Sequence, residues 1–107
     1  MVDQPVVATM EQAIGVAHAI AAAEPNVPVG RLLDSIALFL KDRHCPALRR
    51  DERSVHKIFN AIGDERAVIV TGWLARRAAD WDTFLFWERT QDRYRRRLAA
   101  PTEALVS

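Results

Sequence analysis

The chain has few of the residues that small proteins use for covalent or metal cross-links. It has one cysteine, Cys45, in 107 residues, so an internal disulfide is excluded and no cysteine pair is spaced for zinc. Its four glycines form no glycine-rich phosphate loop. We therefore expect a fold that is held together by its hydrophobic core, in a reducing cytoplasm of bacterial type.

A strong net charge and long apolar runs are also missing. The net charge of +1 excludes the basic balance of proteins that hold nucleic acid by bulk electrostatics. The uncharged run at 12–23 is too short to span a bilayer, and the N-terminus lacks the positive flank of a signal peptide. We therefore expect no membrane partner. Residues 1–40 carry a net charge of −3 and residues 41–107 carry +4, so an anion-facing surface is expected in the second half.

Hydrophobic residues make up 50% of the chain and recur at helical spacing. This pattern predicts an all-α single domain of about five helices over residues 1–107, with 1–8 and 101–107 as flexible ends. Residues 66–71 contain a β-branched run that would suit a strand, but no second strand is available to pair with it, so we predict helix. The expected helices span 10–24, 29–43, 52–62, 65–79 and about 80–99.

Short-range signals place the ends of these helices. Thr9 and Gln12 form a capping-box pattern. Prolines at 25 and 28 end the first helix, and the short connector predicts that the first two helices form an antiparallel hairpin. Residues 47–51 are expected to be a basic loop. Gly63 is expected to end one helix in a left-handed conformation, with Asp64 capping the next.

The first expected helix is apolar on nearly every side, with Glu11 and Glu24 as its charged residues. Such a helix is normally buried on more than one face. One interpretation is that the other helices of the monomer surround it. The other is that it forms the seam of a homodimer or a partner interface, with Leu38 of the next helix beside it. The candidate interface residues are Gly15, Val16, Ala19, Ala22, Ala23 and Leu38.

The last expected helix is rich in aromatic residues. Trp81, Phe84 and Leu85 share one face, which we expect to point into the core and to leave Phe86 outside it with Trp87 at its border. An exposed ring with charged neighbours is typical of a binding anchor. The alternative is that all these rings belong to the core. The candidate partner anchors are Phe86, Trp87, Arg89 and Tyr94.

Arginines gather near two helix ends, where phosphate contacts are one interpretation. The other interpretation is structural, because Glu88, Asp92 and Arg96 are spaced for pairing along one helix and cations stabilise a helix C-terminus. A helix-turn-helix is disfavoured because the expected recognition helix begins with an apolar run at 67–70. The candidate anion contacts are Arg49, Arg50, Arg53, Arg93, Arg96 and Arg97.

No motif in the sequence predicts catalysis, a cofactor or a metal site. The residues that metals favour are His18, His44, His56 and Cys45, and the adjacent pair His44 and Cys45 suits one tetrahedral ion poorly. Neither Cys45 nor Ser54 has a base at a spacing that indicates a nucleophile.

These observations together predict a non-catalytic helical regulator or adaptor, for example one that inhibits or modulates a bacterial regulator. We expect it to be a homodimer and to bind a larger protein through an apolar and aromatic helix surface. The alternative is a small nucleic-acid-binding transcriptional regulator that uses its arginine-rich helix ends.

Overall fold

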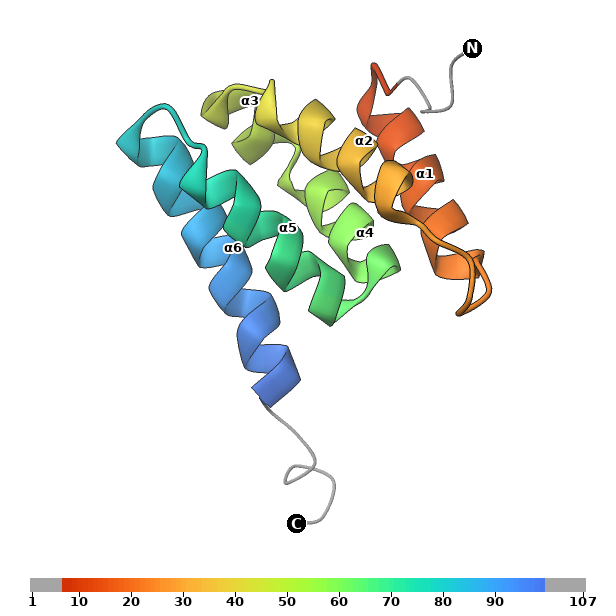
Figure 1. The fold of residues 1–107 in the computed structure, drawn as a ribbon. Helices are drawn as coiled ribbons and strands as arrows, with labels where there is room; N and C mark the ends of the chain where they lie inside the picture. Colours follow the sequence, from red (N-terminus) through yellow and green to blue (C-terminus); the bar gives the residue numbers. More distant parts are fainter. Residues whose placement is uncertain (1–6, 100–107) are drawn as a thin grey trace.

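The computed structural model of the chain describes residues 7–99, which contain six helices and no strand (Figure 1). Most of the ends expected to be flexible, 1–8 and 101–107, lies outside these residues. Val7 packs against the core, and the carbonyl oxygen of Ala8 accepts a hydrogen bond from Arg43 Nη2 at 2.8 Å. The helices are α1 (Met10–Ala22), α2 (Gly30–Lys41), α3 (Cys45–Arg50), α4 (Glu52–Ile62), α5 (Asp64–Arg76) and α6 (Trp81–Ala99).

The all-α prediction is confirmed, including the ambiguous segment at 66–71, which lies within α5. The β-branched run is accommodated because Val70 and Thr71 are buried on the inner face of α5. The Thr71 hydroxyl donates a hydrogen bond to the carbonyl oxygen of Ala67 at 2.6 Å, so its polar group is satisfied inside the helix. Within the described residues, no helix combines the length and the apolar character that a bilayer crossing requires.

The expected basic loop at 47–51 is wrong, because most of it belongs to the extra helix α3. Pro46 lies in the first turn of this helix, where a proline costs no intrahelical hydrogen bond. Leu48, two residues further on, is buried in the core. Pro46 follows the expected helix 29–43 and lies at the start of the next helix rather than in a connecting loop.

The predicted capping box and the predicted left-handed glycine are both confirmed. Thr9 Oγ1 accepts from the Gln12 amide at 3.1 Å and Gln12 Oε1 accepts from the Thr9 amide at 3.2 Å, which completes the capping box. Gly63 has a φ of +95°, a region that favours glycine. Asp80 Oδ1 accepts from the Thr83 amide at 2.8 Å, and this bond lowers the pKa of Asp80. The prediction that Asp64 caps the next helix is wrong, because Asp64 lies in the first turn of α5 and its side chain forms no cap hydrogen bond.

In Figure 1, α1 and α6 lie at opposite edges of the molecule, with α2, α4 and α5 between them. α6 packs along α5, and α1 packs against α4 and α2. A Cβ atom on Gly72 of α5 would lie 2.5 Å from Gln91 Nε2 of α6, so the glycine permits this close approach. The same Gln91 side chain donates a hydrogen bond to the carbonyl oxygen of Val68 at 3.1 Å.

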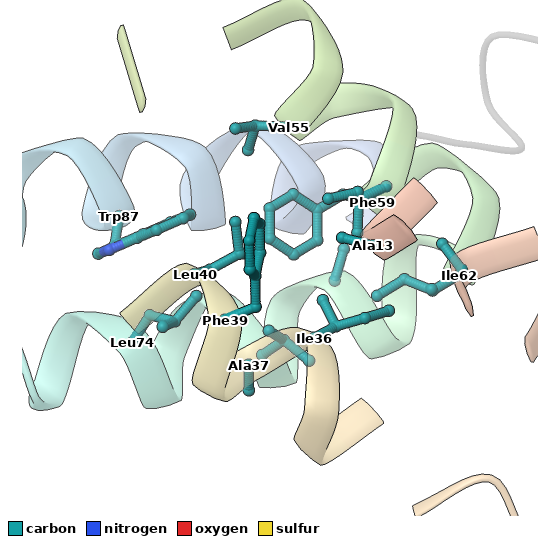
Figure 2. Close-up of a cluster of buried hydrophobic side chains, with 14 of the residues drawn as sticks. Ala13, Ile36, Ala37, Phe39, Leu40, Val55, Phe59, Ile62, Leu74 and Trp87 are labelled. Atoms are coloured by element: carbon teal, nitrogen blue, oxygen red, sulfur yellow. The ribbon is translucent and has the colours of Figure 1, made fainter. Parts of the chain in front are cut away.

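The buried face of α6 consists of Phe86, Trp87, Thr90 and Tyr94. Figure 2 shows Trp87 in the core with side chains of α2, α4 and α5. Its ring meets Phe59 of α4 edge-on, with 6.1 Å between the ring centroids. This face therefore connects α6 to the centre of the molecule.

The expected orientation of α6 is wrong. Phe86 and Trp87 are 7% and 1% exposed, whereas Trp81, which we assigned to the core, is 68% exposed. The buried face of α6 was not recognised in the sequence because it includes Thr90, whose polar side chain interrupts the apolar spacing. Its hydroxyl donates to the carbonyl oxygen of Phe86 at 2.7 Å, so it is buried at little cost.

We predict that Trp87→Ala lowers the free energy of unfolding by about 3–5 kcal/mol, because it leaves a cavity where a fully buried ring packs. Trp81→Ala is the matched control and should cost about 1 kcal/mol or less, since its ring is exposed and stacks on Phe84. Urea denaturation of both variants measures the difference. Equal losses would contradict this orientation of α6.

Candidate anion-binding cleft

A polar cleft of about 380 Å³ opens where α3, α4 and α6 meet. It brings together residues that lie far apart in the sequence: Arg49 comes from α3, and Arg89 and Arg93 come from successive turns of α6. The full lining consists of Arg49, Glu52, His56, Phe86, Arg89, Thr90 and Arg93. The cleft thus joins two predicted anion contacts, Arg49 and Arg93, with Arg89, which we had predicted as a partner anchor.

The charges in this cleft do not balance. Three guanidinium groups face a single carboxylate, that of Glu52, whose side chain is 54% exposed. Within residues 7–99, the side chains of Arg49 and Arg89 form no hydrogen bond or ion pair, and the Arg93 side chain bonds to His56 alone. Guanidinium groups carry their charge at any physiological pH and bind carboxylate or phosphoryl oxygens in forked pairs. The cleft therefore has unused donor capacity that suits an anion.

His56 connects the cleft to the interior through a chain of hydrogen bonds. Arg93 Nη1 lies 3.3 Å from His56 Nε2, and an arginine can only donate, so this nitrogen carries no proton in the bonded state. The proton then sits on Nδ1, which donates to the Tyr94 hydroxyl at 2.9 Å. Tyr94 in turn donates to Asn60 Oδ1 at 3.3 Å. Glu52 Oε2 also lies close to Nε2, at 3.4 Å.

The surroundings favour the neutral form of His56. Burial is the main cause that lowers the pKa of His56 below 6.5, the Arg93 charge adds to it, and Glu52 partly offsets both. Burial also raises the pKa of Tyr94, so its hydroxyl keeps the proton that it donates to Asn60. Both effects are consistent with the hydrogen-bond chain described above.

The remaining predicted anion contacts lie outside the cleft. Arg96 pairs with Asp92 at 2.8 Å, as the structural interpretation of the arginine cluster expected. Arg97 pairs with Asp64 at 3.4 Å and donates to Asn60 Oδ1 at 2.9 Å. Arg50 and Arg53 are exposed and do not line the cleft.

The burial of α6 also bears on the predicted partner anchors. Phe86, Trp87 and Tyr94 are buried, so the argument that they present exposed rings to a partner is wrong. Arg89 remains exposed in the cleft. The exposed aromatic surface of α6 is Trp81, which stacks on Phe84 with 5.3 Å between ring centroids.

The candidate interface on α1 divides into two groups. Gly15, Ala19 and Ala22 are exposed, on the side of α1 away from the buried residues Ala13, Ala17 and Ile20. Leu38 of α2 is 47% exposed. Val16 and Ala23 are half-buried and pack against the core.

The candidate metal ligands are not brought together. Within residues 7–99, no group of three histidine, cysteine or acidic residues is placed to hold an ion. Cys45 is buried at the start of α3, with its Sγ 3.7 Å from the carbonyl oxygen of Asp82. His56 takes part in the cleft, while His18 and His44 do not line it.

The sequence analysis missed three members of this region. It named Glu52 and Thr90 in no site and considered His56 only as a metal ligand. No spacing along the chain could reveal them, because the cleft depends on how α4 and α6 meet in space. Trp81 could have been found from its position next to the Asp80 cap, since a first-turn residue at a loop has few neighbours to cover it.

No protein-family model matches this chain, and no curated protein or solved structure matches it either.

We predict that acidification from pH 7.5 to 5.5 lowers the free energy of unfolding through His56. The pKa of this residue is lowered in the folded state, so the unfolded chain takes up the proton more readily. The stability is present above pH 6.5 and is lost as the pH falls towards the folded-state value. Urea denaturation across this range should show a weaker pH dependence for His56→Gln than for the wild type. An identical dependence would contradict the assignment.

Proposed function

We propose that this chain is a non-catalytic adaptor in the cytoplasm that binds an acidic segment of a larger protein in the cleft between α3, α4 and α6. The observation that carries the proposal is the convergence of Arg49, Arg89 and Arg93 on one cleft that contains a single carboxylate. Carboxylate side chains of an extended acidic segment would take the donors that Arg49 and Arg89 leave unused.

A protein segment fits this surface better than nucleic acid does. A nucleic acid presents successive phosphates and requires a stripe of cations. Three cations that form no ion pair within the described residues, Arg49, Arg89 and Arg93, are instead gathered in one cleft. Arg96 and Arg97 are engaged by Asp92, Asp64 and Asn60.

The same contacts support a binding role over a catalytic one. His56 and Glu52 are the acid–base pair of the cleft, but His56 Nε2 is already an acceptor for Arg93. Thr90 also lines the cleft, and its hydroxyl already donates a hydrogen bond to the backbone carbonyl oxygen of Phe86. The arrangement therefore suits recognition of charge.

We expect a glutamate-rich peptide of about eight residues to bind more tightly than its glutamine counterpart. Arg89→Gln and Arg93→Gln should each weaken binding about tenfold or more, because hydrogen bonds between charged groups contribute about 1.5–3 kcal/mol. Arg95→Gln is the matched control, since it removes the same charge from an exposed position of α6 outside the cleft. Fluorescence anisotropy at fixed salt measures all three.

Two results would overturn this proposal. One is an equal loss of affinity for Arg95→Gln, which would mean that net charge alone drives binding. The other is tighter binding of a DNA duplex than of the peptide at about 0.2 M salt, with dependence on Arg50 and Arg53, which would favour the nucleic-acid alternative.

The second proposal is a homodimer in which α1, as part of an antiparallel hairpin with α2, packs against its copy. Its support is that Gly15, Ala19 and Ala22 are exposed on an edge helix with little charge (Figure 1). Small side chains allow two helix backbones to approach closely, and Leu38 would lie at the margin of the contact.

We expect light scattering at micromolar concentration to give the mass of a dimer for the wild type and of a monomer for Ala19→Glu and Ala22→Glu, because a charge buried in the seam is unfavourable. Ala79→Glu, which places the same charge in the α5–α6 connection, should remain a dimer. A monomeric wild type, or a dimer that tolerates both α1 substitutions, would contradict this seam.

A further inference from the structure

The position of His56 lets one nitrogen serve two opposing partners. Nε2 lies 3.3 Å from Arg93 Nη1 and 3.4 Å from Glu52 Oε2. A neutral Nε2 can accept from Arg93 but has nothing to donate to Glu52. A protonated Nε2 can donate to Glu52 but has no lone pair left for Arg93. The proton therefore decides which of the two charged side chains His56 holds.

The other ring nitrogen keeps its role in both states. Nδ1 donates to Tyr94, and Tyr94 donates to Asn60, whether or not Nε2 is protonated. The ring thus has no reason to rotate when it gains a proton. The exchange of partners takes place at the side of the ring that faces the cleft, where Arg93 and Glu52 are both lining residues.

Protonation changes the cleft in the direction that favours an anion. It releases Arg93 from its hydrogen bond with His56 and draws the Glu52 carboxylate onto the imidazolium. It also adds one positive charge to the lining. Each of these changes makes the cleft more attractive to a negatively charged group.

Burial is the main reason that the free protein resists this proton, and the charges of Arg93 and Arg97 add to it while Glu52 opposes it. Charged groups from three helices surround the ring. Arg49 of α3 and Arg89, Arg93 and Arg97 of α6 are cations, and Glu52 of α4 is the carboxylate that opposes them. Tyr94 is neutral, and Asp64 of α5 acts from further away through its pair with Arg97. An anion bound among the arginines would offset their repulsion of an imidazolium.

We propose that the cleft takes up a proton at His56 when it binds an anion, so that acidification tightens binding; this inference rests on the proposed function. Linkage makes the effect reciprocal, because whatever raises proton affinity at His56 on anion binding raises anion affinity on protonation by the same factor. The expected gain between pH 7.5 and 5.5 is about threefold to tenfold, since each unit by which binding raises the pKa contributes up to tenfold.

Inorganic sulfate is the appropriate probe, because it stays a dianion over this pH range and every change in affinity then comes from the protein. NMR titration of the histidine ring signals gives the pKa of His56 with and without sulfate. The same spectra at pH 5.5 and 7.5 give the dissociation constant of sulfate. We expect the pKa of His56 to rise in sulfate and the dissociation constant to fall at the lower pH.

Variants separate this linkage from general charge effects. In His56→Gln the affinity for sulfate should lose its pH dependence, and in the control His18→Gln, at an exposed position of α1, it should keep it. The pKa measurement on the wild type tests the proposal even where His56→Gln fails to fold.

The outcomes for the two proposals are distinct. Sulfate binding in the cleft with an unchanged pKa of His56 overturns the proton linkage and leaves the adaptor function standing. Failure of the cleft to bind either sulfate or the glutamate-rich peptide overturns the adaptor function, and the linkage with it.

Discussion

The contact of three buried rings, Phe59 of α4 with Trp87 and Tyr94 of α6, sets the spacing on which the rest of the structure depends. The ring of Phe59 lies 6.1 Å from that of Trp87 and 5.8 Å from that of Tyr94, measured between centroids. α6 packs directly along α5, whereas it reaches α4 through these side chains. The cleft opens beside this ring layer and is lined by Phe86 and by polar side chains that include His56 and Arg93. His56 lies one turn before Phe59 and Arg93 lies next to Tyr94, so the core packing positions both.

The same geometry separates arginines that look like one cluster in the sequence. Successive helical residues differ by about 100° in direction, so neighbours along α6 serve different contacts. Arg93 enters the cleft, Arg96 pairs with Asp92, and Arg97 lies over the Tyr94 ring and pairs with Asp64. Arg95 is exposed. Counting the arginines of α6 therefore overestimates the surface that could bind an anion, because Arg96 and Arg97 are already paired with acidic side chains.

Local features of the fold were predictable because they depend on few residues. The Thr9 capping box and the positive φ of Gly63 follow from short-range chemistry. The helical character of 66–71 follows from the lack of a second strand-like segment that could pair with it. The orientation of α6 was not predictable, because Phe86 and Trp81 are both large aromatic residues and the positions of the neighbouring helices decide which of them is covered. α3 was missed because Pro46 can end one helix or begin another. From the sequence, only individual arginines of the cleft could be named. Its other lining residues come together only because α4 and α6 lie close to each other in the fold.

Under the proposed linkage, a proton on His56 weakens the fold of the free protein and strengthens anion binding. In the free protein, burial and the arginines disfavour the imidazolium, so acid weakens the fold. With an anion in the cleft, the proposed linkage reverses that preference, because the imidazolium is then balanced by the ligand and by Glu52. Binding to the folded state also adds stability in proportion to the logarithm of ligand concentration. The complex should thus resist acid better than the free protein does, and the difference in their pH dependence reflects the proton that His56 takes up.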